Sequence, residues 1–135
     1  MVTPKIKLFR VQQICGELAI DPPLINILDE HPQEDGKTIF GRALKYGVVN
    51  IYRGSFEAAY RGALAKASDV VTAEALLETC AAHARHVLLH ELWHCKQLAE
   101  NRDLVLTRSD AEAEAAELAA ANDHRWPDVV TFVDE

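Results

Sequence analysis

The stretch HVLLHELWHCKQLAE, residues 86–100, decides how the rest of this 135-residue chain is interpreted. Its centre, His90-Glu91-Leu92-Trp93-His94, fits the pattern H-E-x-x-H inside a long helical run. Two histidines four residues apart on a helix project from one face, so both rings reach one divalent cation. Glu91 points beside that cation, where a carboxylate accepts a proton from a metal-activated water. The pattern predicts the first half of a zinc site.

A pair of helical histidines can also be a solvated pair or a packed one, and the neighbouring residues argue against both. Leu92 and Trp93 inside the motif are apolar, as is the preceding turn Val87–Leu89. This helix is therefore expected to be buried on more than one side. Buried polar groups need partners, and a bound metal ion supplies them for two histidines.

Composition indicates one domain, residues 1–135, of ordinary globular character with 49% hydrophobic residues. A formal net charge of −7 argues against a nucleic-acid-binding surface. No N-terminal run is long or apolar enough for a signal peptide or a membrane span. Cys15, Cys80 and Cys95 are odd in number and lack C-x-x-C spacing, which predicts reduced thiols and a cytoplasmic location.

The first half of the chain combines a helix with a small sheet. Apolar residues at helical spacing predict an amphipathic helix over residues 6–20. Leu24–Leu28 is a short β-branched run that predicts a strand, and residues 29–37 are typical of a loop. Residues 38–44 and 48–52 flank a turn at 45–47 and predict a hairpin. The sheet is expected to be largely antiparallel, or mixed.

The second half is expected to be helical. Ser55 is in position to cap a short helix from Phe56 to Lys66, and Thr72 a long one from Ala73 to Glu100. A further helix is predicted from Ser109, with acidic residues in its first turn. The fold class is therefore α+β, with a small antiparallel or mixed sheet packed against the long H-E-x-x-H helix and the helix that follows.

A third protein ligand is needed to complete the site. The candidates are acids and histidines near the motif: Asp110, Glu112, Glu114, Glu117, His124, His83 and His86. Asp110, Glu114 and Glu117 form one acidic stripe, which is typical of a solvated helix face. Glu112 lies on a different side, among alanines that allow close approach to the motif helix. We favour Glu112 as the ligand, with Glu114 next.

H-E-x-x-H followed after 17 residues by E-x-x-A-x-x-x-A, beginning at Glu112, resembles the gluzincin metallopeptidases, particularly their smallest members. The resemblance covers residues 38–120 and implies a zincin-like fold. It also implies that His90, His94 and Glu112 bind Zn²⁺, with Glu91 as general base. In that group an edge strand holds the substrate backbone, here expected to be Val48–Tyr52 (Val48, Val49, Asn50, Ile51 and Tyr52). Tyr46, Tyr52, Arg108 and His124 are the candidate oxyanion donors, although each also has a structural interpretation.

The function expected from these residues is zinc-dependent hydrolysis of a peptide or protein substrate, with no nucleic-acid or membrane partner. The alternative is a catalytically silent zinc-binding domain that uses the same groove to bind a peptide or protein. A third hypothesis is an interaction domain without metal, in which the histidines only pack. The sequence does not indicate an oligomeric state.

Overall fold

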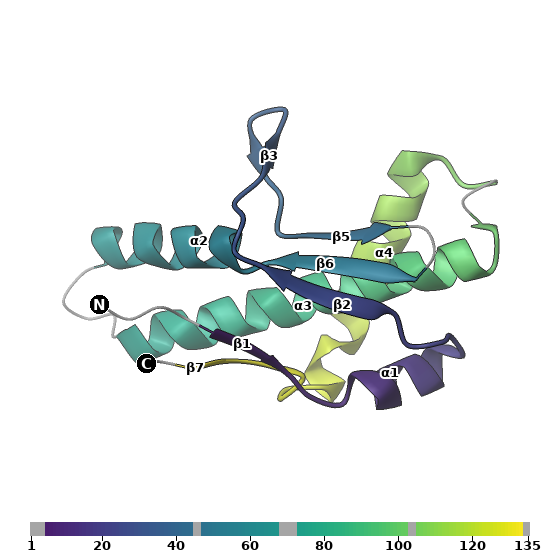
Figure 1. Ribbon diagram of the computed structural model, residues 1–135, viewed down its shortest axis with the longest axis horizontal. Helices are drawn as coiled ribbons and strands as arrows, with labels where there is room; N and C mark the ends of the chain where they lie inside the picture. The colour runs from purple at the N-terminus through teal and green to yellow at the C-terminus, as the bar shows by residue number, and fades with distance from the viewer. Residues whose placement is uncertain (1–4, 45–46, 68–72, 103–104, 134–135) are drawn as a thin grey trace.

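Helix α3 (Ala73–Ala99), 27 residues long, is the element around which the other helices and strands pack in this computed structural model (Figure 1). The structure describes residues 5–44, 47–67, 73–102 and 105–133. Leu88 and Leu92 of α3 are completely buried, as their apolar surroundings predict. Within the described residues, no helix is both long and apolar enough to cross a membrane.

A three-stranded sheet lies along α3. Its order is β2 (Leu24–Leu28), β6 (Val48–Tyr52) and β5 (Gly41–Leu44). β2 runs parallel to β6, whereas β5 runs antiparallel to it, so the sheet is mixed. The predicted strand at 24–28 and the pairing of the next two strands are confirmed. Residues 45–46 of the predicted turn lie outside the described residues.

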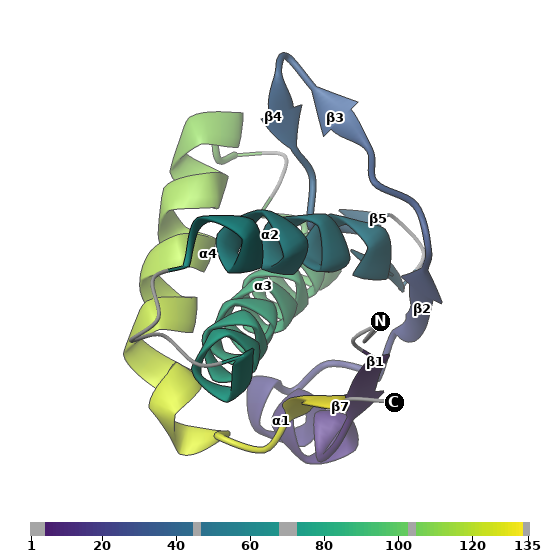
Figure 2. The same cartoon turned by 90° about the vertical axis from the view of Figure 1, so that its left-hand side faces the viewer.

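A small hairpin, β3 (Gln33–Glu34) and β4 (Lys37–Thr38), projects from the sheet where a loop was predicted (Figure 2). Asp35 and Gly36 at its tip both have positive φ, 52° and 74°. Asp-Gly is a favoured pair for a two-residue hairpin turn, because that turn needs φ > 0 at both positions. The loop prediction overlooked this signal.

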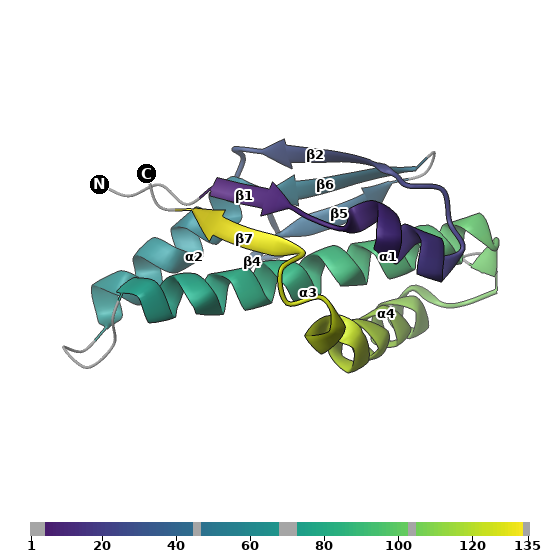
Figure 3. The same ribbon diagram turned by 90° about the horizontal axis from the view of Figure 1, so that it is seen from below.

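The predicted helix over residues 6–20 is wrong at its start. β1 (Lys5–Leu8) pairs antiparallel with β7 (Val130–Val133), and only α1 (Val11–Leu18) is helical. Figure 3 shows this strand pair lying along α3. Exposure alternates residue by residue along β1, which is the period of a strand. Its partner is far away in sequence, so local spacing does not reveal it.

α2 (Arg53–Lys66) begins directly after β6, earlier than the predicted start at Phe56. The predicted cap at Ser55 is also wrong, because its buried hydroxyl lies inside the helix and donates to the Ile39 carbonyl at 2.6 Å. Gly54 lies against the 29–30 backbone, where a Cβ would come within 2.2 Å of the Asp29 carbonyl oxygen. The cap predicted at Thr72 falls outside the described residues.

α4 (Arg108–Asn122), followed by the short 3₁₀ helix η2 (Asp123–Arg125), packs beside α3 (Figure 2). It begins one residue before the predicted Ser109, because the Thr107 hydroxyl accepts a hydrogen bond from the Asp110 amide at 3.0 Å and caps it. Ala115 and Ala119 are completely buried. Small side chains on this face allow close approach of the two helices.

The core lies between α3, the three-stranded sheet and the β1–β7 pair. It is built from large apolar side chains of all three layers, with α2 contributing Phe56 and the chain before β7 contributing Val129. Val49 and Ile51 point from β6 toward α3, whereas their neighbour Asn50 pairs with Asn26 on the sheet's other face. This packing fixes the motif helix against β5, on which the candidate site depends.

Candidate metal centre

The two motif histidines meet on one face of α3. Their Nε2 atoms lie 2.9 Å apart, and the rings are packed edge to face with centroids 4.7 Å apart. Leu88 and Leu92 on the opposite side of the helix are in the core, so burial of that side turns the histidines toward α4. The α-helical spacing of the motif thus places the two ring nitrogens where one ion could bind both.

Glu112, in the second turn of α4, reaches both histidines. One carboxylate oxygen lies 2.9 Å from His90 Nε2 and the other 3.1 Å from His94 Nε2. The Glu112 side chain is 55% exposed, so it approaches from the solvent side. Buried Ala115, one turn further along, lets α4 lie close enough for this contact. The structure therefore brings together the three residues that were expected to bind zinc.

Hydrogen bonds alone do not satisfy His90 Nε2, His94 Nε2 and the Glu112 carboxylate at these distances. A carboxylate oxygen only accepts, and a neutral imidazole carries one N–H. If both Nε2 atoms carried protons for Glu112, two donors would face each other across the 2.9 Å between His90 and His94. A cation at the centre would instead satisfy all three acceptors. Three zinc ligands with bonds of about 2.0–2.1 Å lie roughly 3.3–3.4 Å apart, so a small outward adjustment would fit the ion.

The other candidates for the third ligand lie elsewhere. Glu114 pairs with Arg102 through both guanidinium nitrogens, and this contact lowers the pKa of its carboxyl. Glu117 is exposed on α4, and His124 is in η2 beyond the far end of that helix. His83 packs against the rings of Phe40 and Phe56. No contact among the described residues brings any of these four to the two motif histidines.

His86 lies one turn before His90 on the same face, with the ring centroids 6.3 Å apart. The pKa of His90 is held below its usual range, first by burial and second by the nearby His94. His90 is therefore neutral near neutral pH. A neutral imidazole keeps the lone pair that a metal ligand needs.

Glu91 projects from α3 and is buried against β5, with 7% of its surface exposed. Burial raises the pKa of Glu91 to about 7, against opposing effects from His94 and from a hydrogen bond donated by the Ala43 amide. One of its carboxylate oxygens lies within 4.8 Å of a ring nitrogen of His90 and of His94. A carboxyl group with a pKa near neutrality is suited to take up and release a proton at this place.

Gly41 on β5 allows the close approach of Glu91. A Cβ at this position would lie 2.9 Å from Val87 Cγ1 and 3.2 Å from Glu91 Cγ. Neither Gly41 nor Ala43 was singled out from the sequence. The signal that was present is a glycine inside a strand, which often marks a close approach of another segment.

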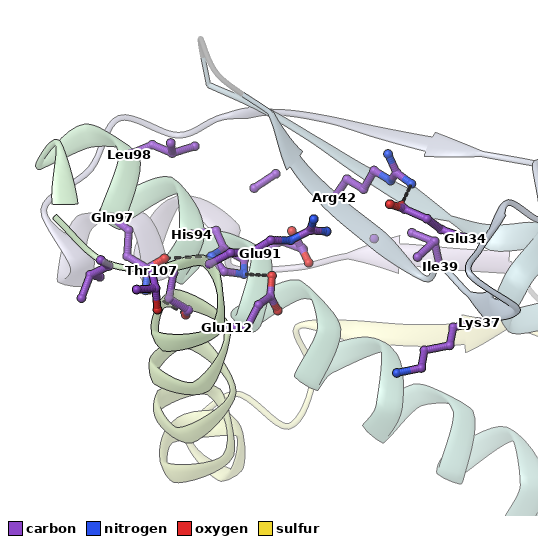
Figure 4. Close-up of a pocket in the computed structure, with 15 residues that line it drawn as sticks. Glu34, Lys37, Ile39, Arg42, Glu91, His94, Gln97, Leu98, Thr107 and Glu112 are labelled. Carbon is purple, nitrogen blue, oxygen red and sulfur yellow. Dashed lines mark hydrogen bonds and ion pairs between the residues drawn. The ribbon is translucent and has the colours of Figure 1, made fainter. Parts of the chain in front are cut away.

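A groove of about 780 Å³ opens over these residues (Figure 4). Glu91, His94 and Glu112 lie near its middle, with Leu98 and Thr107 toward one end and Lys37 and Ile39 toward the other. The rest of the lining comes from β3, β5, the end of α3, the start of α4 and the residues just before it, namely Glu34, Gly41, Arg42, Ala43, Gln97, Leu106, Arg108 and Ala111.

The expectation that Val48–Tyr52 forms the edge strand is wrong. β6 is the middle strand of its sheet, paired with β2 on one side and β5 on the other. Its backbone groups are used within the sheet, so it cannot receive a further chain along an edge. β5 is the strand that lines the groove, through Gly41, Arg42 and Ala43.

The candidate oxyanion donors differ in whether they lie at the groove. Arg108 lines the groove. Tyr52 is buried in the sheet, and His124 lies in η2, away from the groove-lining residues. Tyr46 falls outside the described residues. Arg108 is thus the member of this set placed to face a ligand.

Gln97, one turn after His94, was also missed. Its side-chain oxygen lies 2.8 Å from His94 Nδ1. A polar residue at this spacing after the second histidine was the available signal, because metal-binding histidines commonly have a partner for the other ring nitrogen.

No protein-family model, curated protein or solved structure matches this chain.

Proposed function

We propose that this chain is a small zinc-dependent peptidase with a gluzincin-like centre in a zincin-like fold. The convergence of His90 Nε2, His94 Nε2 and the Glu112 carboxylate on one point carries the proposal. Two imidazoles and a carboxylate, with a further position left open, are the ligand set of catalytic zinc sites. Glu91, buried beside that point, is the second element that such a centre requires.

Each residue has a distinct task in this proposal. A bound zinc ion would polarise the scissile carbonyl and lower the pKa of a coordinated water. Glu91 accepts a proton at its carboxylate and passes it to the departing amine. The Ala43 amide holds the Glu91 carboxylate in place. Arg108, on the wall of the groove, is available to stabilise negative charge on the substrate.

The substrate is proposed to lie as an extended strand along β5. The Tyr52 amide donates to the Phe40 carbonyl at 2.9 Å, which makes these two residues a hydrogen-bonded pair. Such pairs alternate along an antiparallel ladder, so the backbone groups of Gly41 and Ala43 point away from β6. They face the side on which the groove lies. The Ala43 amide is engaged by Glu91, so the Gly41 backbone groups and the Ala43 carbonyl are the ones proposed to pair with a peptide that adds as a further strand.

The test is metal content followed by hydrolysis. We expect about one zinc ion per chain after purification without added metal. Casein or a mixed peptide pool should be cleaved, and Glu91→Gln should keep zinc yet reduce cleavage by at least about 100-fold. Glu78→Gln, an exposed position on the same helix, is the control.

The possible results separate three functions. Cleavage that survives Glu91→Gln would refute the proposed role of Glu91. Zinc without turnover in the unaltered chain would point to the silent binding domain instead. If the chain binds no zinc, the interaction domain without metal is the hypothesis that remains. The proposed partner is accordingly a peptide or protein, and the cytoplasmic location expected from the cysteines stays a prediction.

A further inference from the structure

Gln97 is a buried polar side chain, 2% exposed, that contacts both helices of the candidate centre. Its oxygen lies 2.8 Å from His94 Nδ1 on its own helix. Its nitrogen donates to the Ala111 carbonyl of α4 at 3.1 Å and to a Glu114 carboxylate oxygen at 3.4 Å. Both ends of this buried amide therefore have hydrogen-bond partners, and these partners determine its orientation.

The chemistry of these partners assigns the orientation of the amide. A carbonyl and a carboxylate only accept, so the NH₂ group of Gln97 must face Ala111 and Glu114. The oxygen then faces His94, and an amide oxygen also only accepts. His94 must therefore carry a proton on Nδ1. In the neutral ring this leaves Nε2 with its lone pair, directed at His90 and Glu112.

The same amide also sets the position of α4. Ala111, whose carbonyl accepts from Gln97, immediately precedes Glu112. Glu114 is held in turn by Arg102, just beyond the end of α3. The network therefore joins the helix that carries two of the proposed ligands to the helix that carries the third.

We propose that Gln97 is a positioning residue of the metal centre, which holds the His94 proton on Nδ1 and aligns α4 so that Glu112 meets the histidines. This inference rests on the proposed zinc site. Gln97 does not touch the metal position itself. Its effect is exerted through His94 and through the main chain next to Glu112.

Gln97→Met tests this, because methionine has a similar shape and lacks both hydrogen-bonding atoms. Zinc affinity is measured by competition with a chromophoric chelator. Loss of a partner of a metal-binding histidine typically weakens metal affinity about 10–100-fold, and we expect that range here. Gln13→Met, at an exposed position on α1, should leave the affinity unchanged.

A second readout separates positioning from simple packing. In the zinc-loaded chain, NMR should show the His94 Nδ1–H proton protected from exchange with water, and Gln97→Met should remove this protection while sparing the His90 ring. Gln97→Glu should keep it, since a carboxylate also accepts from Nδ1–H, while its second oxygen faces the Ala111 carbonyl and the Glu114 carboxylate and so loses the link to α4. This second variant also serves if methionine prevents folding.

Unchanged zinc affinity in Gln97→Met would overturn the inference. Weaker affinity with an unchanged His94 signal would overturn the role of Gln97 in holding the His94 proton, since Gln97 would then act only through its contact with α4. If the unaltered chain binds no zinc, the proposed function fails first and this inference with it. Zinc binding in the unaltered chain followed by either negative result in the variant refutes the role of Gln97 alone.

Discussion

Gly41 and Glu91 show how one missing side chain shapes the candidate centre. Glu91 belongs to the motif helix and Gly41 to the strand that lines the groove, and their atoms come within contact distance. The strand can approach α3 this closely only because position 41 has no Cβ. The buried environment that raises the pKa of Glu91 to about 7 depends on that approach.

Gly41→Ala should therefore destabilise the chain. The added Cβ would meet Val87 Cγ1 at 2.9 Å, and overpacking of this kind costs about 1–3 kcal/mol in the free energy of unfolding. Urea denaturation measures the change. Gly62→Ala in α2, where nothing lies within 4 Å of the new Cβ, should instead stabilise by about 0.5–1 kcal/mol. Equal effects at the two positions would contradict the packing described for Gly41.

At the scale of elements, α3 contacts α2 and the chain before β5 through an aromatic cluster. His83 of α3 packs against Phe40 and Phe56 with ring centroids 4.6 and 5.3 Å away. Burial, and to a lesser degree the charge of His86, lowers the pKa of His83. His83 is therefore a ring that packs against these two phenylalanines and anchors the helix, with part of its own surface exposed, rather than a ligand.

This packing predicts a pH dependence of stability. Unfolded His83 binds a proton near its ordinary pKa of 6.5, whereas the folded side chain resists it. The free energy of unfolding should thus fall as pH decreases below 6.5. His83→Phe keeps an aromatic ring and should flatten the slope, which urea midpoints between about pH 7 and about pH 5 would measure. Identical slopes in the two chains would refute the role assigned to His83.

The elements that the sequence predicted well are those specified locally. α3 ends within one residue of its expected boundary, and Leu24–Leu28 is a strand. The pairing of β1 with β7 and the central place of β6 depend on distant partners, and no local period encodes them. For the site, helical spacing predicted the two histidines and the small-residue face predicted Glu112. Gln97 and Ala43 act through contacts that only the packed chain shows.

At the scale of the whole molecule, the candidate ligands divide between two helices. α3 supplies His90 and His94, and α4 supplies Glu112. An ion held by all three residues would link the central helix to the last long helix, so metal binding and folding are expected to be coupled.

Zinc should therefore stabilise the folded chain. A ligand present at about 100 times its Kd adds about 2.7 kcal/mol to the free energy of unfolding if it binds only the folded state. Thermal unfolding with zinc and with excess chelator measures this. Glu112→Ala should lose most of the zinc-dependent gain, while Glu117→Ala, an exposed acid on the same helix, should keep it. Absence of any zinc-dependent gain in the unaltered chain would refute the proposed centre.

The pairing of β1 with β7 has a consequence for synthesis. The two strands come from opposite ends of the described chain, and β7 packs on α3. A ribosome makes β1 before the other described elements, and its partner strand β7 after them. Until then the flank of α3 that Val129 and Val130 cover stays open to water. Completion of this core is therefore a late step, and nascent chains stalled before residue 130 should recruit chaperones.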